Sequence, residues 1–396
     1  MKKDIFWPLM KNTISKKDID VLINFIKKTK MFTSSKNVLL FEKKWNEWLG
    51  SKYSLFVSSG STANMLLISA IKEKYKLEYG DKVLVPCCTW STNIAPVIQL
   101  GLIPVFCDIN LYDFSFDINS LKKISKEHKD IKVVFVTHLL GIPANIELYK
   151  NIFPNSIFIE DACEAAGTEI NGIKVGTFSE VSSFSFYFGH MMTCIEGGMV
   201  STNDLELYHL MKLKRSHGLA RELPHDEFIK QSQKYSDIDP KFLFLTDGFN
   251  FRNTEIAAVL GISQLKRLDI TNKKRKENYQ LFIDCITNYK DYFFIPKTEG
   301  NCSFCLPFIC KSSIFKNELQ RKLNQSGIET RPVVGGNLLK QPFLQKYNNS
   351  ITPYYNADIL NDNGFYVGNN HFVFKKHLNV LFKIIDTLCL KNSQDK

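Results

Sequence analysis

The stretch YSLFVSSGSTANMLLISAIKEKY, residues 53–75, decides the class of fold. Its first five residues, Tyr53–Val57, form an apolar run of strand length, and a serine-rich turn around Gly60 follows. From Thr62 to Tyr75 the apolar residues return at helical spacing. The stretch therefore predicts a strand, a tight turn and a helix whose N-terminus lies at the carboxyl end of the strand.

The same alternation of apolar runs and helical segments continues to residue 160. The runs lack the polar–apolar alternation of half-exposed strands, which is typical of strands buried on both faces. Strands separated by helices predict a mostly parallel sheet covered by helices, with ligands at the carboxyl ends of the strands. The expected strands are Val83–Pro86, Ile103–Cys107, Val133–Val136 and Ile157–Glu160, and the expected helices between them are Thr92–Leu100 and Ile118–Ser125.

The remainder of the chain predicts a second domain. With 396 residues, the chain is longer than one hydrophobic core usually supports. The apolar pattern changes after a charged stretch, so we predict a large domain over residues 1–270 and a smaller α/β domain over residues 271–396. Helices are expected at Lys16–Lys30, Asn37–Leu49, Asn253–Leu268 and Leu378–Lys391, and segments of the small domain at Phe304–Phe308, Phe315–Leu323 and Glu329–Arg331.

The composition is that of a folded globular protein with an excess of positive charge. Hydrophobic residues make up 44% and charged residues 23%, which excludes a disordered or fibrous chain. The net charge of 51 − 40 = +11 favours anionic ligands. The basic residues are scattered, and their one close cluster, Lys273–Lys276, is expected on a solvated helix. We therefore predict no nucleic-acid partner, whereas a phosphate-bearing small molecule suits the charge.

The cysteines and the N-terminal residues favour a cytoplasmic protein. The ten cysteines are dispersed, mostly in apolar runs, as is typical of reduced thiols. The first residues lack the apolar stretch of a signal peptide, and no run is long enough to span a membrane, so no membrane partner is predicted. Cys302, Cys305 and Cys310 form the closest grouping, and without a fourth ligand nearby we expect core cysteines and no metal site.

Three strand ends carry side chains suited to binding an anion or a ring. Gly60 and Ser61 open a helix directly after a strand, where hydroxyl and N–H groups can hold a phosphate. An ordinary helix cap is the alternative there. Asp161 follows a buried strand and could hold a protonated ring nitrogen, or cap a helix that begins at Ala162. Trp90 also follows a strand, and it could stack on a flat ring or simply pack.

A further candidate is the segment SFYFGH, residues 185–190, and the residues after it. His190 lies between an expected strand and a glycine-flanked loop, a position that can present a side chain to a cleft. A lone histidine is nevertheless more often structural than catalytic.

Together these segments resemble the nucleotide-sugar aminotransferases of the DegT/StrS type. The resemblance covers nearly the whole chain. It implies the fold-type-I architecture of pyridoxal-phosphate-dependent transferases, similar to aspartate aminotransferase, with a large mostly parallel sheet domain and a smaller C-terminal α/β domain. It also implies a homodimer with shared active sites. The matching segments are Ser59–Asn64, the strand-end Asp161, Ser185, the turn Glu196-Gly197-Gly198 and the run Gly248–Ala258.

One position departs from the family's pattern. The family's Schiff-base lysine is expected five residues after the phosphate-binding serine, and five residues after Ser185 this chain has His190. Since imidazole cannot form that covalent link, the chain resembles the branch of sugar 3-dehydratases in which histidine replaces lysine. This implies removal of the C3 hydroxyl of a nucleotide-linked 4-keto-6-deoxy sugar for surface-polysaccharide synthesis. Pyridoxamine phosphate would be the working form of the cofactor, restored from pyridoxal phosphate with glutamate as amino donor.

The resemblance also implies the role of each site residue. His190 would be the base, and Asp161 would pair with the ring nitrogen of the cofactor. His138 and His217 are expected to be structural or to support the residues that touch the ligand. The cofactor phosphate would be bound by Gly60, Ser61 and Ser185, joined by Asn250 of a neighbouring subunit. Trp90 would stack on the cofactor ring and Glu164 would lie beside it. The sugar or the donor carboxylate would be contacted by Glu329 and Arg331.

Two other functions stay open. The first is a sugar aminotransferase that works without the covalent lysine, which would differ only in leaving the amino nitrogen on the sugar product. The second is an inactive family member that serves as a structural dimer. The chain has no Cys-x-Cys pair of the kind that holds an iron–sulfur cluster in one relative of this branch, so no cluster is expected. The nucleotide and the stereochemistry of the sugar are not predicted.

Overall fold

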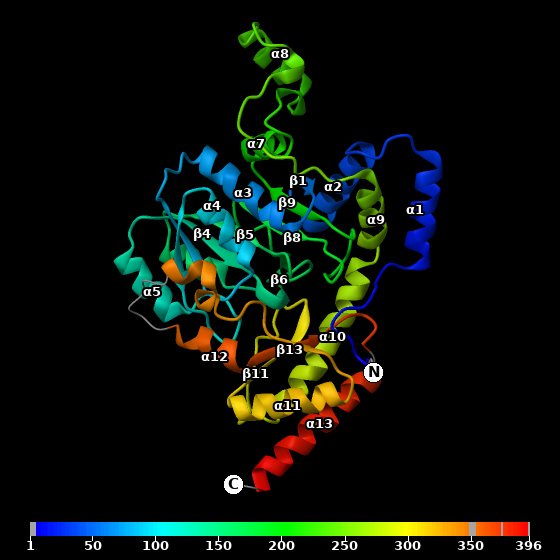
Figure 1. Ribbon diagram of the computed structural model, residues 1–396, viewed down its shortest axis with the longest axis vertical. Helices are drawn as coiled ribbons and strands as arrows, with labels where there is room; N and C mark the ends of the chain where they lie inside the picture. The colour runs from blue at the N-terminus through cyan, green and yellow to red at the C-terminus, as the bar shows by residue number, and fades with distance from the viewer. Residues whose placement is uncertain (1–4, 348–353, 374, 395–396) are drawn as a thin grey trace.

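Two main β-sheets organise the protein (Figure 1). The computed structural model describes residues 5–347, 354–373 and 375–394. In the seven-stranded sheet β9 is antiparallel to β1 and β8, and every other pairing is parallel, which confirms the predicted mostly parallel sheet. Its order is β1 (Tyr53–Val57), β9 (Gly198–Thr202), β8 (Val181–Ser185), β5 (Ile157–Asp161), β4 (Ile131–Thr137), β2 (Lys82–Pro86) and β3 (Ile103–Cys107).

Helices cover both faces of this sheet because alternate side chains of its buried strands point to opposite sides. Leu55 and Val57 belong to one apolar cluster, whereas Phe56 between them belongs to another. The first face packs against α3 (Gly60–Lys74), α4 (Ala95–Gln99) and α7 (Leu205–Arg215), and the second against α2 (Lys36–Leu49), α5 (Ile118–Glu127), α6 (Ile146–Ile152) and α9 (Glu255–Leu265).

Two expected helices differ from the structure. The helix expected over Thr92–Leu100 is replaced by a 3₁₀ turn, η1 (Ser91–Asn93), followed by α4. Pro96 stands in the first turn of α4 and has no N–H to donate, so one continuous helix cannot run through it. The helix expected over Asn253–Leu268 is shorter, because Thr254 caps α9 by accepting from the N–H of Ala257.

The second sheet has four strands, and all of its pairings are antiparallel. It packs against α11, α13 and the second half of α10. The elements are β10 (Phe293–Phe294), β11 (Cys305–Cys310), β13 (Gly364–Gly368), β12 (Thr330–Arg331), α10 (Leu268–Thr287), α11 (Ser313–Gln325), α12 (Tyr355–Asn363) and α13 (Lys375–Gln394).

The first described residues also lie on this small sheet. The backbone N–H of Trp7 donates to the Gly327 carbonyl and its indole Nε1 to the Gly368 carbonyl, both at 2.9 Å. The predicted boundary near residue 270 falls in the first turn of α10, a helix that contacts both sheets. The division into residues 1–270 and 271–396 remains a prediction.

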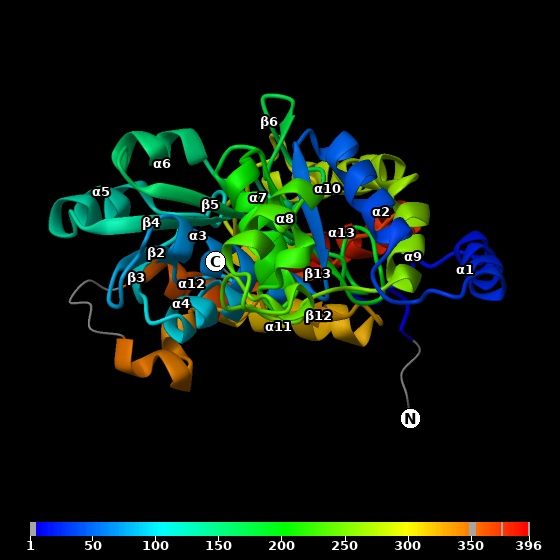
Figure 2. The same ribbon diagram turned by 90° about the horizontal axis from the view of Figure 1, so that it is seen from above.

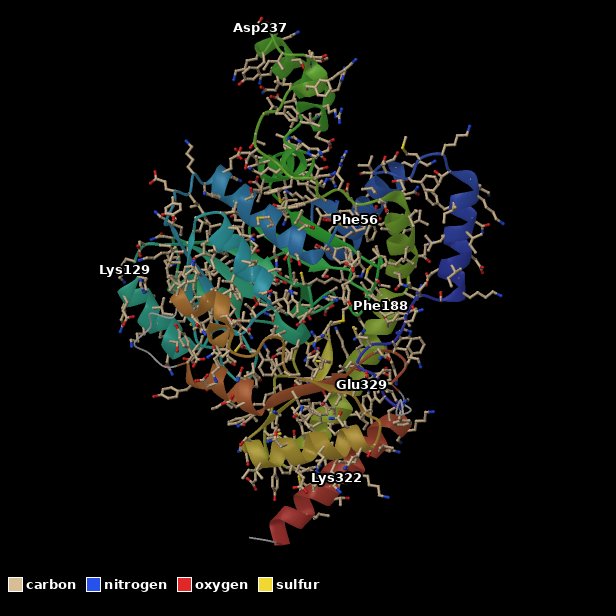
Figure 3. The ribbon with its side chains drawn as sticks, viewed as in Figure 1. Phe56, Lys129, Phe188, Asp237, Lys322 and Glu329 are labelled. Atoms are coloured by element: carbon tan, nitrogen blue, oxygen red, sulfur yellow. The ribbon has the colours of Figure 1, made fainter. Side chains whose placement is uncertain are left out.

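Three smaller features lie outside these layers. Figure 2 shows α1 (Lys16–Lys28) at one end of the molecule, with α5 and α6 toward the other end. A two-stranded hairpin is formed by β6 (Glu169–Ile170) and β7 (Ile173–Lys174). Residues 219–245, called the arm below, carry α8 (His225–Lys234) and project from the body, with Asp237 near the tip (Figures 1 and 3). Among the described helices, none is both long and apolar enough to cross a membrane.

The expected solvated helix at Lys273–Lys276 requires a correction. Lys273 is exposed, but Arg275 is only 3% exposed. The residues lie on α10, which passes between the two sheets, so one face of a charged stretch is turned inward. Charge density along the sequence therefore does not distinguish the two faces of this helix.

Asp18 fixes α1 to α9. Its carboxylate is fully buried, accepts from Ser263 Oγ at 2.6 Å and receives both terminal nitrogens of Arg267. It also forms a reciprocal cap with Ser15. Burial opposes ionisation, but these hydrogen bonds outweigh it and lower the pKa of Asp18.

Asp18→Asn is expected to lower the free energy of unfolding by about 3 kcal/mol, because it leaves Arg267 without its carboxylate partner. The folded-state pKa lies below the ordinary value of 3.8, so this contribution is present above that pH and is lost as the pH falls through the folded pKa. Urea unfolding at several pH values measures both effects. Asp20→Asn, at an exposed position of the same helix, is the matched control, and equal losses in both variants would contradict the interpretation.

Candidate active site

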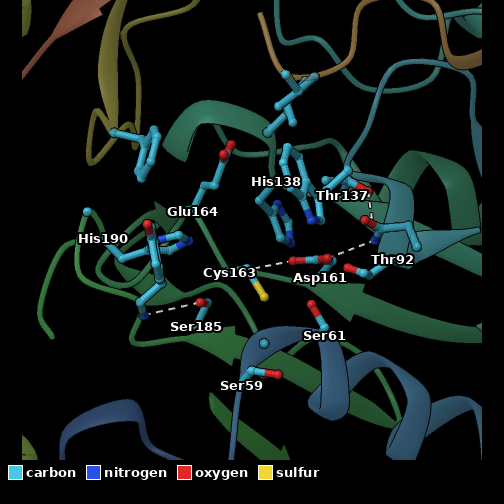
Figure 4. Close-up of a pocket in the computed structure, with 18 of the residues that line it drawn as sticks. Ser59, Ser61, Thr92, Thr137, His138, Asp161, Cys163, Glu164, Ser185 and His190 are labelled. Carbon is cyan, nitrogen blue, oxygen red and sulfur yellow. Dashed lines mark hydrogen bonds between the residues drawn. The ribbon is translucent and has the colours of Figure 1, made fainter. Parts of the chain in front are cut away.

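A cavity of about 350 Å³ lies where β4, β5 and β8 end, between the two sheets. Side chains from both sheets and from the N-terminal segment line it. Figure 4 shows those from the start of α3 and from the ends of β5 and β8. Ten residues were predicted for the site, and the structure brings eight of them to this cavity. These are Gly60, Ser61, Trp90, Asp161, Glu164, Ser185, His190 and Arg331.

Two predicted site residues lie elsewhere. Asn250 is exposed at the base of the arm, where its side-chain oxygen accepts from Arg252 Nε at 3.2 Å. The Glu329 carboxylate accepts from the backbone N–H of Leu9 at 2.9 Å, so within this chain it holds the N-terminal segment.

The N-terminus of α3 forms one wall of the cavity. Ser59 caps the helix by accepting from the N–H of Thr62 at 3.1 Å, while the N–H of Ser59 donates to Thr62 Oγ1. The N–H groups of Gly60 and Ser61, in the first turn, have no carbonyl one turn earlier to accept them. A Cβ on Gly60 would lie 2.7 Å from Ser185 Cβ, so glycine permits the close approach of helix and strand. Ser59 is therefore a helix cap, and the N–H groups after it are available to an anion, so the phosphate interpretation stays a prediction.

Asp161 is buried at the end of β5 and is surrounded by donors. Asn64 and Asn93 donate their amide nitrogens to its Oδ2 at 2.9 Å and 2.8 Å, and the N–H of Cys163 donates to Oδ1 at 2.8 Å. No helix begins at Ala162, where the described chain turns instead, so the helix-cap alternative for Asp161 is wrong. The carboxylate is therefore fixed at the bottom of the cavity.

His138 lines the cavity at the end of β4, and hydrogen bonds to both of its ring nitrogens fix its orientation. Its Nε2 lies 2.9 Å from a carboxylate oxygen of Glu160, and its Nδ1 accepts from the N–H of Ala144 at 3.1 Å. Because Nδ1 is an acceptor, the ring is neutral with its proton on Nε2. Burial opposes the charge of Glu160, but hydrogen bonds from His138 and its neighbours outweigh it and lower the pKa of Glu160. His217 does not line the cavity.

Glu164 faces the cavity opposite the helix cup (Figure 4). One of its carboxylate oxygens accepts from the N–H of Leu140 at 2.9 Å, and Leu140 adopts the left-handed backbone conformation with φ of 56°. Burial and the charge of Asp161 raise the pKa of Glu164 to about 7, against the opposing effect of Leu140 and Arg331. Glu164 can therefore carry or release a proton near neutral pH.

His190 lies on the turn that joins β8 to β9. The turn is closed by bonds from the N–H of Phe186 to the Gly197 carbonyl and from the N–H of Cys194 to the Phe186 carbonyl. The ring contacts Phe304 edge-on, with 5.3 Å between centroids, and its Nδ1 is buried without a partner among the described residues. Burial, assisted by the charge of Arg275, lowers the pKa of His190 to about 4. The imidazole is thus a neutral proton acceptor at pH 7.

Trp90 stands at the mouth of the cavity with 47% of its surface exposed, which does not fit the alternative that it only packs. Sequence reasoning missed the two asparagines on Asp161. Asn64 belongs to the quoted helix start, but nothing in its local pattern shows that it reaches a carboxylate 97 positions away.

Residues 12–366 match the DegT/DnrJ/EryC1/StrS aminotransferase family. The chain belongs to this family. The match confirms the resemblance read from the motifs around Gly60, Asp161 and Ser185.

Two similar proteins of the family share one name. A GDP-4-keto-6-deoxy-D-mannose 3-dehydratase of Yersinia pseudotuberculosis is 35% identical over 393 residues, which covers 96% of this chain and 98% of that protein. A protein of the same name from Escherichia coli O55:H7 is 34% identical over 371 residues, covering 90% and 94%. The solved structure of an E. coli enzyme of this name with bound hydrated PLP has a TM-score of 0.87 and 32% identity, covering 96% of this chain and 99% of that one. These likenesses confirm the predicted fold class.

The titration of His190 can be measured directly. In the full-length chain with ¹⁵N-labelled histidine, its signal is expected to titrate with a midpoint near 4 rather than at the ordinary 6.5. The neutral form is favoured by the fold, so this group costs stability as the pH falls from 6.5 toward 4. His190→Asn identifies the signal by removing it, and a midpoint at 6.5 would contradict the buried, neutral base.

Proposed function

We propose that the protein is a pyridoxamine-phosphate-dependent 3-dehydratase that removes the C3 hydroxyl of a GDP-linked 4-keto-6-deoxy sugar. The observation that carries this proposal is His190. It lines the cavity five residues after Ser185, where the family's covalent lysine is expected. The relatives that share the 3-dehydratase name, at 34% and 35% identity, support the same reaction and the GDP-linked sugar.

The cavity fits the cofactor in three respects. The approach of α3 to Ser185, which only a glycine at position 60 allows, makes a cup for the phosphate. The fixed Asp161 carboxylate can pair with a protonated ring nitrogen, and Trp90 at the mouth can stack on the ring. When bound, pyridoxamine phosphate supplies an amine that condenses with the 4-keto group and a ring that accepts the electron pair released by deprotonation.

The residues of the chain supply the proton transfers. His190 is neutral at pH 7, so one of its ring nitrogens can accept a proton as general base. The resulting imidazolium can give that proton to the C3 hydroxyl, which then leaves as water. A lysine at this place would hold the cofactor covalently and favour transamination, whereas histidine leaves the amine free for the sugar.

The complete cycle needs an amino donor. Hydrolysis of the product releases ammonia, and the amino group of the cofactor must then be restored. Glutamate is the proposed donor, and Arg331, a cation on the cavity wall, is the proposed partner of its carboxylate or of the sugar ligand. Over one cycle the sugar loses an oxygen and gains no nitrogen.

The mass of the product tests the reaction. Incubation with pyridoxamine phosphate, excess glutamate and a GDP-linked 4-keto-6-deoxyhexose is expected to give a sugar one oxygen lighter, with ammonia released. His190→Asn is expected to slow turnover by about 10²–10⁴-fold, since it replaces the general base with a smaller, planar amide that cannot accept the proton.

Each other outcome has a defined meaning. A product in which an amine replaces the keto oxygen would identify an aminotransferase. Failure of the chain to bind pyridoxamine phosphate would point to an inactive structural member of the family. Full dehydratase activity in His190→Asn would exclude the role assigned to the histidine.

We also propose a cytoplasmic homodimer that shares its active sites and makes a deoxysugar for a surface polysaccharide. The ten free cysteines suit a reducing compartment. Asn250, predicted to reach a neighbouring subunit's cofactor, is exposed and outside its own cavity. The arm above it carries exposed apolar side chains, which favour a protein interface. They are Ile229, Tyr235, Ile238, Phe242 and Phe244.

Mixing two impaired variants tests the shared site. If Asn250 serves the partner's cofactor, a heterodimer of His190→Asn and Asn250→Ala regains one intact site, and full subunit exchange restores roughly a quarter of wild-type activity. His190→Asn mixed with Ser185→Ala is the matched control, because both residues line the same chain's cavity and no intact site can form. No recovery in the first mixture, or a monomer by light scattering, would contradict the shared site.

A further inference from the structure

Arg275 is a buried cation without an acidic partner among the described residues. Its guanidinium donates to the backbone carbonyl of Phe304 at 3.2 Å and to that of Asn369. Its Nε has no hydrogen-bond partner within residues 5–347, 354–373 and 375–394. A neutral amide could bridge two carbonyls at a lower desolvation cost than a charge. The charge therefore calls for an explanation beyond holding two loops together.

The surroundings of Arg275 connect it to His190. Phe304, whose carbonyl accepts from Arg275, places its ring edge-on against the imidazole, with 5.3 Å between centroids. Arg275 and His190 also line one small pocket of about 50 Å³ beside the main cavity. Asn369, the second acceptor, is itself tied to α10, because its side-chain amide donates to the Arg275 carbonyl at 3.0 Å.

We propose that Arg275 is a positioning residue for His190, which fixes the imidazole through Phe304 and places a positive charge behind it. The proposal rests on the function proposed above, in which His190 is the base. A cation behind the ring opposes its protonation, so the imidazole stays free to accept a proton from a ligand in the cavity. The low pKa of His190, caused first by burial and then by Arg275, agrees with this role.

Other charged or titratable groups also line these two cavities. Lys11 and Arg331 are exposed, so solvent screens their charges, whereas Arg275 is fully enclosed. The acidic groups are on the main cavity, away from the small pocket. The complete set is Lys11, Arg275 and Arg331; Asp161, Glu164 and Glu196; and His138, Cys163, Tyr187, Cys305 and Tyr366.

Three variants of the full chain separate charge from packing. In Arg275→Gln the His190 midpoint, followed by ¹⁵N NMR, is expected to rise by about 1 pH unit, with kcat at least about ten-fold lower. Arg275→Lys keeps the charge but loses the rigid planar guanidinium whose Nη1 donates to both carbonyls, so its midpoint should stay near 4 while kcat falls at an unchanged KM for the sugar. Lys273→Gln removes a charge from an exposed position of the same helix and should change neither quantity.

A His190 midpoint in Arg275→Gln equal to that of the wild type would overturn the proposal. Should Arg275→Gln fail to fold, Arg275→Lys decides, because full kcat in that variant would overturn the positioning role. The titration needs neither cofactor nor substrate. An absence of dehydratase activity in the wild type, which would refute the proposed function, is therefore distinguishable from a failure of this inference.

Discussion

A buried carboxylate needs hydrogen-bond donors on every side, and Asp161 obtains them from separate parts of the chain. Asn64 comes from α3, Asn93 from η1, and Cys163 from the turn after β5. Asn64 in turn accepts from Ser183 Oγ of β8 at 2.6 Å. One charge thus sets the relative positions of a helix, a turn and two strands at the edge of the sheet where the cavity lies.

The rest of the cavity is arranged around that fixed point. Asn64 anchors α3 so that the first turn of the helix contacts Ser185. Because Gly60 has no side chain, the helix can approach the strand that carries Ser185 closely. The small sheet supplies Arg331 and Tyr366 to the opposite wall, and α10 connects the two layers behind His190. A site built between two packed layers excludes water more fully than a sheet edge alone, which strengthens its electrostatic interactions.

Whether a residue of the site could be predicted from the sequence depends on whether its neighbours in the chain indicate its role. Gly60 and Asp161 follow apolar runs closely, so the rule that ligands bind at strand ends was enough to select them as candidates. The role of Ser185 came instead from the resemblance to the family. The role of His190 also came from that resemblance, because the family's lysine is expected five residues after the phosphate-binding serine. Asn93 could not be found in this way, because its partner Asp161 is 68 positions away and neither neighbourhood encodes the contact. Arg275 was misassigned to solvent, since a run of four basic residues does not show which face of a helix is buried.

The N-terminal segment has a consequence for the order in which the protein is made. Trp7 is one of the most deeply buried aromatic residues, yet its indole bonds to a carbonyl 361 positions further along the chain. Translation proceeds from the N-terminus, so this tryptophan leaves the ribosome long before its binding place exists. The seven-stranded sheet, complete by Thr202, can form while the C-terminal half is still being synthesised. Trp7 must therefore be among the last residues to reach its final position.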